Sequence, residues 1–292
     1  MAARDTDDGR TTQSHLSDRG LFLHEVVDIV GQGQYSYMEH VNREPVQRMD
    51  GMMRLQGTFF VCAAGGGGRW PQVVNVWDLG PDGWDAWARN VDRLNLKRRK
   101  AFYGDWWDAA AQWRSGGYDR LLGAMPGSPT TAEIAARGIT GTLFLHEVQT
   151  IAPDRRDAYL DDVAQTRVPL MREHGHEIVG LYEVLGDARE VVLLWATSVT
   201  AQAALRRAED RARGRAAGPT DDRLASWHAT TLGYGVHGSA EVMTPLPGTV
   251  YGPADWEDAD LSDWLGDTGS AEGTGSAEGT GSADDDGNGG PT

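Results

Sequence analysis

The sequence contains a single cysteine, Cys62, among 292 residues. An internal disulfide is therefore impossible, and a structural metal site built from several cysteines is excluded. The sequence also lacks any apolar run near the roughly 18 residues that a membrane-spanning helix needs. Its first 20 residues are polar and contain no hydrophobic segment of the kind found in secretion signals. Together these absences favour a cytoplasmic protein that has no membrane partner.

Clustered positive charge is also missing from the sequence. The net charge of −16 includes eleven acidic residues and no Lys or Arg after residue 252, so residues 1–252 carry a net charge of −5. The one basic run, at residues 97–100, is short and is typical of a solvated helix face. Nucleic-acid binding requires clustered positive charge that displaces phosphate counterions. We therefore expect no nucleic-acid partner.

The sequence does contain a duplication. The segment Leu-Phe-Leu-His-Glu-Val occurs at residues 21–26 and again, 122 positions later, at residues 143–148. Further matches follow both copies at nearly the same spacing: Tyr37 with Tyr159, Arg43 with Arg167, Gly51 with Gly175, and Trp77 with Trp195. A repeat spacing of about one domain length indicates that one folding unit occurs twice in the chain.

Hydrophobic patterning predicts the order β-α-β-β-α-β in each half. This order is typical of an α+β unit with a four-stranded antiparallel sheet and both helices on one face. The bare faces of two such sheets would cover each other about a pseudo-twofold axis. The predicted strands are residues 21–30, 53–63, 72–79, 118–125, 141–152, 177–185, 190–198 and 232–243, and the main helices are residues 33–50, 81–94, 153–175 and 200–213.

The predicted organisation has four parts. Residues 1–18 form a disordered leader, residues 19–130 the first repeat, residues 131–252 the second repeat, and residues 253–292 an acidic tail rich in glycine and serine. Trp256, Leu261, Trp264 and Leu265 lie among the acidic residues of the tail. This segment is expected to dock on its own barrel or on a protein partner. In the helix at 81–94, helical spacing predicts a buried face made of Trp84, Trp87, Val91 and Leu94.

The second half resembles a known family in several places. Its first strand is followed by Pro153-Asp154, its first helix contains Pro169-Leu170 and ends at His174-Gly175, and its third strand runs from Val191 to Trp195. These motifs resemble the dimeric α+β barrel superfamily, and most closely a NIPSNAP-type domain. The resemblance covers residues 141–245, and the first half matches through its likeness to the second.

The resemblance implies a ferredoxin-like fold with a pocket between or beside the sheets that takes a hydrophobic small-molecule substrate. Members of the superfamily include cofactor-free monooxygenases of antibiotic biosynthesis, polyketide cyclases, isomerases and haem-binding proteins. NIPSNAP-type strands usually carry an arginine where this chain has Glu147 and, by repetition, Glu25. The sign of that charge is therefore reversed, so a family ligand cannot be assumed.

The repeated strand carries the candidate catalytic residues, His24-Glu25 and His146-Glu147. Neighbouring strand residues point to opposite faces, so the His and Glu of one pair cannot share a site. If the histidines face the space between the sheets, they meet across the pseudo-axis as acid–base groups or metal ligands. If the glutamates face it, the pocket is acidic and accepts a proton from substrate. The resemblance favours the glutamates inward, which would leave the histidines a structural role under the helices.

Aromatic and histidine residues supply the candidate ligand contacts, each weighed against a role in the core. Trp107 belongs to a tryptophan-rich segment that either walls an aromatic ligand or packs between helices. His228 and His237 are candidates for facing a pocket from the last strand or just before it. The other candidates are Tyr37, Tyr159, Trp77 and Trp195.

Residues 173–177 have the sequence Glu-His-Gly-His-Glu, which resembles a cluster of metal ligands. The favoured interpretation is a helix end capped by Gly175, because cations are favoured at helix C-termini and glycine is the usual cap. No metal is therefore expected, although haem remains possible as a cofactor.

The sequence thus predicts a cofactor-independent enzyme of specialised metabolism. It would rearrange, cyclise, dehydrate or oxygenate a hydrophobic or aromatic metabolite. Two alternatives stay open: a haem- or ligand-binding protein with a histidine axial ligand, and an interaction module that uses the acidic tail. A homo-oligomer is a further expectation.

Overall fold

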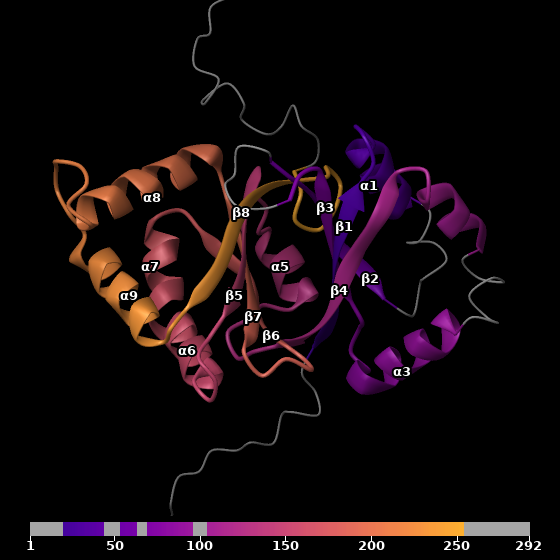
Figure 1. The fold of residues 1–292 in the computed structure, drawn as a ribbon, viewed down its shortest axis with the longest axis horizontal. Helices are drawn as coiled ribbons and strands as arrows, with labels where there is room; N and C mark the ends of the chain where they lie inside the picture. The colour runs from indigo at the N-terminus through magenta and orange to yellow at the C-terminus, as the bar shows by residue number, and fades with distance from the viewer. Residues whose placement is uncertain (1–19, 44–52, 63–68, 96–103, 254–292) are drawn as a thin grey trace, which may run out of the picture.

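A computed structural model describes residues 20–43, 53–62, 69–95 and 104–253 of the chain (Figure 1). The predicted leader, nearly all of the acidic tail and the four-glycine turn at residues 65–68 lie outside the described residues. None of the helices in the described ranges has the length and apolar character needed to cross a membrane. The elements are β1 (Leu21–Ile29), α1 (Gln34–Arg43), β2 (Arg54–Val61), β3 (Gln72–Asp78), α3 (Gly83–Leu94), β4 (Arg114–Ala124), α5 (Thr131–Arg137), β5 (Leu143–Thr150), α6 (Arg156–Asp162), the π-helix η1 (Val163–Arg167), α7 (Val168–Glu173), β6 (Glu177–Val184), β7 (Glu190–Thr197), α8 (Val199–Ala212), α9 (Asp222–Gly233) and β8 (His237–Pro245).

The eight strands close into one antiparallel barrel in the order β1-β3-β2-β8-β5-β7-β6-β4. Each half contributes four adjacent strands, and the halves join through the pairs β2–β8 and β4–β6. These two junctions are equivalent under exchange of the halves. The predicted α+β class and the pseudo-twofold barrel are therefore confirmed. Full closure leaves no open sheet edge.

Matching irregularities in the two halves reflect the duplication. The ladder between β2 and β3 shifts register at Gly57, and the ladder between β6 and β7 shifts at Gly180. A Cβ atom at Gly57 would lie 2.5 Å from the ring of Phe59, and one at Gly180 would lie 2.2 Å from the ring of Tyr182. Each half therefore uses a glycine to let the next inward aromatic ring lie flat on the strand.

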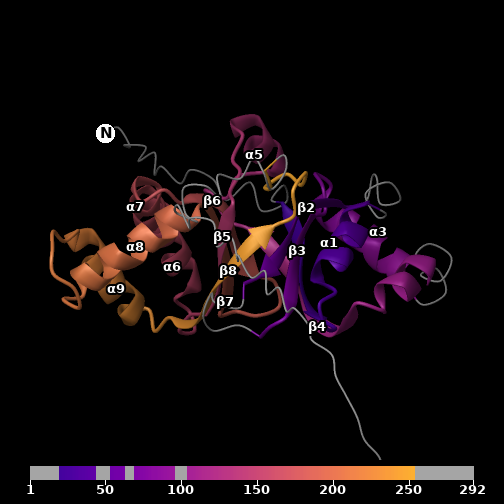
Figure 2. The same ribbon diagram turned by 90° about the horizontal axis from the view of Figure 1, so that it is seen from above.

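The helices of the two halves lie on opposite sides of the barrel (Figure 1). The second-half helices α6 to α9 cover β5, β6 and β7, while α1 and α3 lie on the first-half side. Helix α5, seen over the middle of the barrel in Figure 2, places Ile134 in the cluster that fills the barrel interior. That cluster also contains Phe22, Phe59, Phe144 and Tyr182. The interior is thus a packed core, and separate apolar clusters lie under the helices on each side.

Two helices differ from the prediction made from the sequence: α3 buries a different face, and α5 was not predicted. The predicted buried face of α3 is wrong, because Trp84, Trp87 and Val91 are 47%, 37% and 48% exposed. Ala86 and Asn90 are buried instead, and the small Ala86 side chain packs with Leu21 of the barrel wall. Helix α5 was not predicted, although Thr130 and Glu133 form a capping box at its start.

Candidate functional site

The duplicated His-Glu pairs divide between the two sides of the barrel wall. His24 and His146 point into the interior, where they are 0% and 2% exposed, and their Nε2 atoms lie 3.1 Å apart. Glu25 and Glu147 point outward, beneath the helices. The expectation that the glutamates face the space between the sheets is therefore wrong. The cluster that fills the interior consists mainly of apolar side chains, whereas hydrogen-bond donors to both glutamates are found on the outer side.

The histidine pair is a buried polar contact on the pseudo-twofold axis. One imidazole donates to the other, so at least one of the two is neutral. His146 Nδ1 lies 3.3 Å from a Glu241 carboxylate oxygen, whereas His24 Nδ1 has no partner among the described residues. Burial, followed by the charges of His146 and Arg120, holds the pKa of His24 well below its usual value. Neither histidine lines the two cavities described next.

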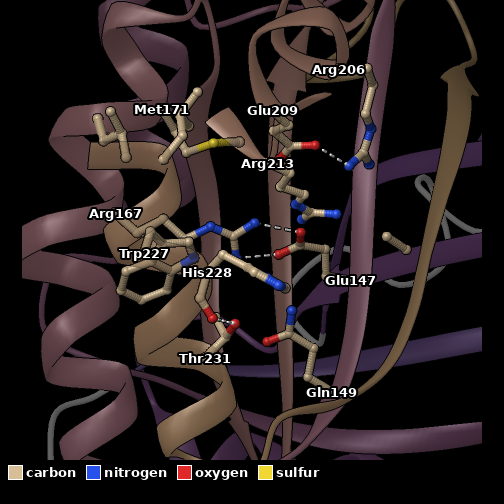
Figure 3. Close-up of a pocket in the computed structure, with 13 residues that line it drawn as sticks. Glu147, Gln149, Arg167, Met171, Arg206, Glu209, Arg213, Trp227, His228 and Thr231 are labelled. Atoms are coloured by element: carbon tan, nitrogen blue, oxygen red, sulfur yellow. Dashed lines mark hydrogen bonds and ion pairs between the residues drawn. The ribbon is translucent and has the colours of Figure 1, made fainter. Parts of the chain in front are cut away.

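A cavity of about 150 Å³ lies between the outer face of β5 and the helices α7, α8 and α9 (Figure 3). At its base, Arg167 donates two hydrogen bonds of 2.6 Å to the two carboxylate oxygens of Glu147. Glu147 also accepts a 3.4 Å bond from the Trp195 indole. The remaining lining residues are Gln149, Leu170, Met171, Arg206, Glu209, Arg213, Leu224, Trp227, His228, Thr231 and Ala240.

The Glu147–Arg167 pair is buried, with the two residues 4% and 8% exposed. Burial alone would raise the pKa of Glu147, but the charge and hydrogen bonds of Arg167 outweigh burial and leave that pKa below its usual value. Conversely, the pKa of Arg167 is raised by Glu147 despite its burial. Glu147 is therefore a fixed carboxylate with both oxygens engaged, which makes it a poor proton acceptor.

The first half has its own cavity, of about 390 Å³, against the outer face of β1 and β4. Glu25 lines this cavity and is only partly buried. It accepts hydrogen bonds from the Trp77 indole at 2.6 Å and from the Asn75 amide at 3.2 Å. Both bonds reach the same carboxylate oxygen, Oε2.

A second carboxyl group faces Glu25 across the β1–β4 ladder, where Asp119 is its direct partner. Burial, followed by the charge of Asp119, raises the pKa of Glu25. Burial also raises the pKa of Asp119, although the charge of Arg114 opposes this. Arg114 lines the same cavity, and its guanidinium carbon lies 3.5 Å from the ring centroid of Trp107. The cavity therefore joins two carboxyl groups of raised pKa, a guanidinium group and an aromatic wall.

The remaining residues that the sequence singled out lie in three kinds of place. Trp107 lines the first-half cavity, as the ligand-wall hypothesis requires. His237 is exposed at the start of β8 and lines neither cavity. Four others are fully buried in the clusters beneath the helices: Tyr37, Tyr159, Trp77 and Trp195.

The two tryptophans of this set are more than core residues, because their indoles hydrogen-bond Glu25 and Glu147. Tyr159 donates to Gln149 at 2.5 Å, and Tyr37 accepts a 3.4 Å bond from Asn75. Burial is the main cause that raises the pKa of both tyrosines. These two phenols therefore keep their protons and serve as fixed hydrogen-bonding groups.

The segment at residues 173–177 behaves as a helix end. Helix α7 ends at Glu173, and Gly175 adopts a φ of 77°, as a C-terminal cap requires. His174 lies 3.4 Å from Asp221, whereas His176 lies 2.7 Å from Gln202. The two imidazoles are thus engaged with different partners.

Sequence reasoning missed Asp119, Arg114 and Arg213 altogether and used Arg167 only as a match between the repeats. Asp119 and Arg114 come from a strand whose start was placed at residue 118, too late to include Arg114. Asp119 pairs with Glu25 across β1 and β4, and paired residues point to the same face of a sheet. Knowledge of this pairing register would therefore have placed Asp119 on the outer face.

A haem group, which the resemblance left possible, does not fit either cavity. The second-half cavity has about 150 Å³, below the roughly 300–1,000 Å³ of pockets that hold drug-sized ligands. The Glu147–Arg167 pair also occupies its base. The first-half cavity is larger, but no histidine is among the described residues that line it.

The sequence matches no protein-family model and no curated protein. Solved structures do share the fold. A protein from Fusobacterium nucleatum, provisionally assigned as a monooxygenase, matches at 9% identity and a TM-score of 0.50, with 78% of this chain and 93% of that chain covered. A second provisionally assigned monooxygenase, from Lactobacillus acidophilus, matches at 8% identity and a TM-score of 0.48, covering 78% and 94%. Chlorite dismutase from Candidatus Nitrospira defluvii matches at 12% identity and a TM-score of 0.38, covering 79% and 93%.

At these identities the likeness shows the fold alone. The chain has the fold of the dimeric α+β barrels, with both halves of the barrel supplied by one polypeptide.

Proposed function

We propose that this protein is a small-molecule enzyme whose first-half cavity catalyses proton transfer on a hydrophobic or aromatic metabolite. The observation that carries the proposal is the pair Glu25 and Asp119, which face each other across β1 and β4 in a cavity of about 390 Å³. That volume is within the range of small-molecule sites. Two carboxyl groups of raised pKa in a cleft are a recognised sign of acid–base chemistry.

Glu25 is the proton acceptor in this scheme. Its Oε2 atom accepts the bonds from Trp77 and Asn75, so those bonds fix the carboxylate while Oε1 remains available for substrate. The proton moves from a C–H or O–H group of the substrate to Oε1, and the electron pair stays on the substrate. Arg114 offsets the resulting negative charge, and Trp107 provides an apolar face for the substrate ring.

Return of the proton to a different atom completes an isomerisation. Loss of a hydroxide group, protonated by the same carboxylic acid to leave as water, completes a dehydration. Attack of the carbanion on a carbonyl of the same molecule completes a cyclisation. Oxygenation would require molecular oxygen as the oxidant of the carbanion. The finer proposal of two NIPSNAP-like halves is supported by the repeated motifs, and a place in antibiotic or other specialised metabolism is part of the same proposal.

The proposal is tested with a generic aromatic probe of base strength, because the natural substrate is not identified. Opening of 5-nitrobenzisoxazole transfers one proton to the base, breaks the ring N–O bond and releases a coloured phenolate. We expect the full chain to accelerate this reaction, with a pH profile whose inflection lies above the usual carboxyl range because the pKa of Glu25 is raised.

The variant E25Q is expected to reduce the rate by about 100-fold, the lower end for a positioned base. The matched control is E173Q, because Glu173 is exposed at the end of α7 and lines neither cavity. Equal rates for E25Q and wild type, with circular dichroism showing both folded, would remove Glu25 from this role.

A further inference from the structure

The second-half cavity differs from the first in charge, size and lining. Three guanidinium groups line it, those of Arg167, Arg206 and Arg213, but only two carboxylates. Glu147 is bound to Arg167 and Glu209 to Arg206, the latter at 2.8 Å. The positive charge of Arg213 is therefore left without a counter-charge in the cavity.

Arg213 and His228 both line the cavity with free side chains. Among the residues that the structure describes, neither side chain makes a hydrogen bond or an ion pair. Figure 3 shows both groups directed toward the Glu147–Arg167 pair. The Nε atom of Arg167, which is 8% exposed, is also buried without a partner. Two unpaired donor side chains, Arg213 and His228, thus line the same cavity.

Besides the polar Gln149 and Thr231, the rest of the lining is apolar. Leu170, Met171, Leu224 and Ala240 form its walls together with the indole of Trp227. The guanidinium carbon of Arg167 lies 5.7 Å from the Trp227 ring centroid. A dry apolar cavity near 150 Å³ is known to accommodate a benzene ring, and the volume here is about 150 Å³. The space therefore fits one small ring or a branched alkyl group, but not a cofactor.

We propose that this cavity binds a small organic carboxylate, of the size of an aryl monocarboxylate. Its ring lies against Trp227 and Leu224, and its carboxylate pairs with the planar fork of Arg213. His228 donates a further hydrogen bond to the same carboxylate. Arg213 is exposed, so a small anion can reach its guanidinium group from solvent.

The site is separate from the proposed proton-transfer site, because the two cavities share no lining residue. The second half thus supplies a binding site for an acid, whereas the first half supplies proton transfer. The binding test below does not involve turnover, so its outcome is independent of the function proposed above.

The test is a calorimetric titration of the full chain with benzoate and, in parallel, with benzamide. Benzamide has nearly the same shape but carries no charge. Wild-type protein is expected to bind benzoate saturably at millimolar concentrations and to bind benzamide at least tenfold more weakly. In R213Q, benzoate binding is expected to fall about tenfold to a hundredfold, the range for a lost charge-assisted hydrogen bond.

The matched control is R215Q. Arg215 is also exposed and lies two residues further along the chain, but it does not line the cavity. Benzoate affinity should be unchanged in this variant. Three results would each overturn the proposal: no saturable benzoate binding by wild type, equal affinity for benzoate and benzamide, or equal losses in R213Q and R215Q.

Discussion

Replacement of Glu147 by glutamine tests the different states of the two repeated glutamates. The change leaves the Arg167 guanidinium, 8% exposed, in the cavity base without a counter-charge. Breaking a buried pair by removing one partner costs about 3–5 kcal/mol, because the remaining charge is desolvated and unpaired. Total stabilities are usually about 5–15 kcal/mol, so E147Q should remove about a fifth or more of the free energy of unfolding.

The matched variant is E25Q in the other half. The pKa of Glu25 is raised, so the folded state disfavours its ionised form. Above the folded pKa this ionised carboxylate lowers stability, because the folded state holds the proton more tightly than the unfolded state does. Substitution by the neutral, similarly shaped glutamine removes that loss. At pH 8, E25Q should therefore be as stable as wild type or more stable.

Urea denaturation followed by tryptophan fluorescence measures both effects. A double variant, E147L/R167M, completes the cycle, because replacing a whole buried pair by apolar groups is often neutral or stabilising. We expect wild type and E25Q to be about equally stable, the double variant to be close to them, and E147Q to be far less stable. Equal losses in E147Q and E25Q, or a double variant no better than E147Q, would refute the assignment of a buried ion pair to one half only.

Two further predictions concern the barrel itself. The pKa of His24 is lowered in the folded state, so the unfolded chain binds a proton at His24 more readily than the folded chain does. The free energy of unfolding should therefore be at its full value above about pH 6.5 and fall below that pH, by at most about 1.4 kcal/mol per pH unit. Urea midpoints measured from pH 5 to 8 should show this slope, and H24L should reduce it. A Cβ atom at Gly238 would lie 2.1 Å from the carbonyl oxygen of Val148, so G238A should lower the free energy of unfolding by about 1–3 kcal/mol. In the control variant G233A the added Cβ meets nothing within 4 Å, so the free energy of unfolding should not fall. Equal thermal midpoints for these two variants would contradict the close approach of β8 to β5 at Gly238.

The fold was predictable because the duplication can be recognised in the amino-acid sequence. The repeated segment at β1 and β5, and the strand pattern that follows it, specify one unit twice, and two units with bare sheet faces must cover each other. Helix α3 was assigned the wrong face because apolar spacing identifies an amphipathic stripe but not what covers it. Trp84 and Trp87 form the stripe, yet small Ala86 is the residue that fits the wall.

The site was predictable only in part. Alternation along a strand established that His24 and Glu25 lie on opposite faces, but it could not decide which face is the interior. That choice depends on the whole set of strand neighbours, such as Phe22 and Val26, which share the face of His24 and belong to the interior cluster. Partners such as Arg167, which reaches Glu147 from a π-helical turn, depend on helix geometry that no local pattern specifies.

The divergence of the two glutamates can be traced to two positions where the repeats differ. In the ladders beside the repeated strand, Glu25 faces Asp119 on one side and Asn75 on the other, whereas Glu147 faces Ala240 and Leu193. In the first half, the second carboxylate raises the proton affinity of Glu25, and the amide satisfies its fixed oxygen. In the second half, the neighbouring alanine and leucine offer neither a charge nor a donor, so the charge comes from Arg167 and the donors are Arg167 and the Trp195 indole. The same duplicated strand therefore carries a titratable acid in one half and a permanently ionised structural group in the other, as a consequence of the residues beside it rather than of the repeated segment itself.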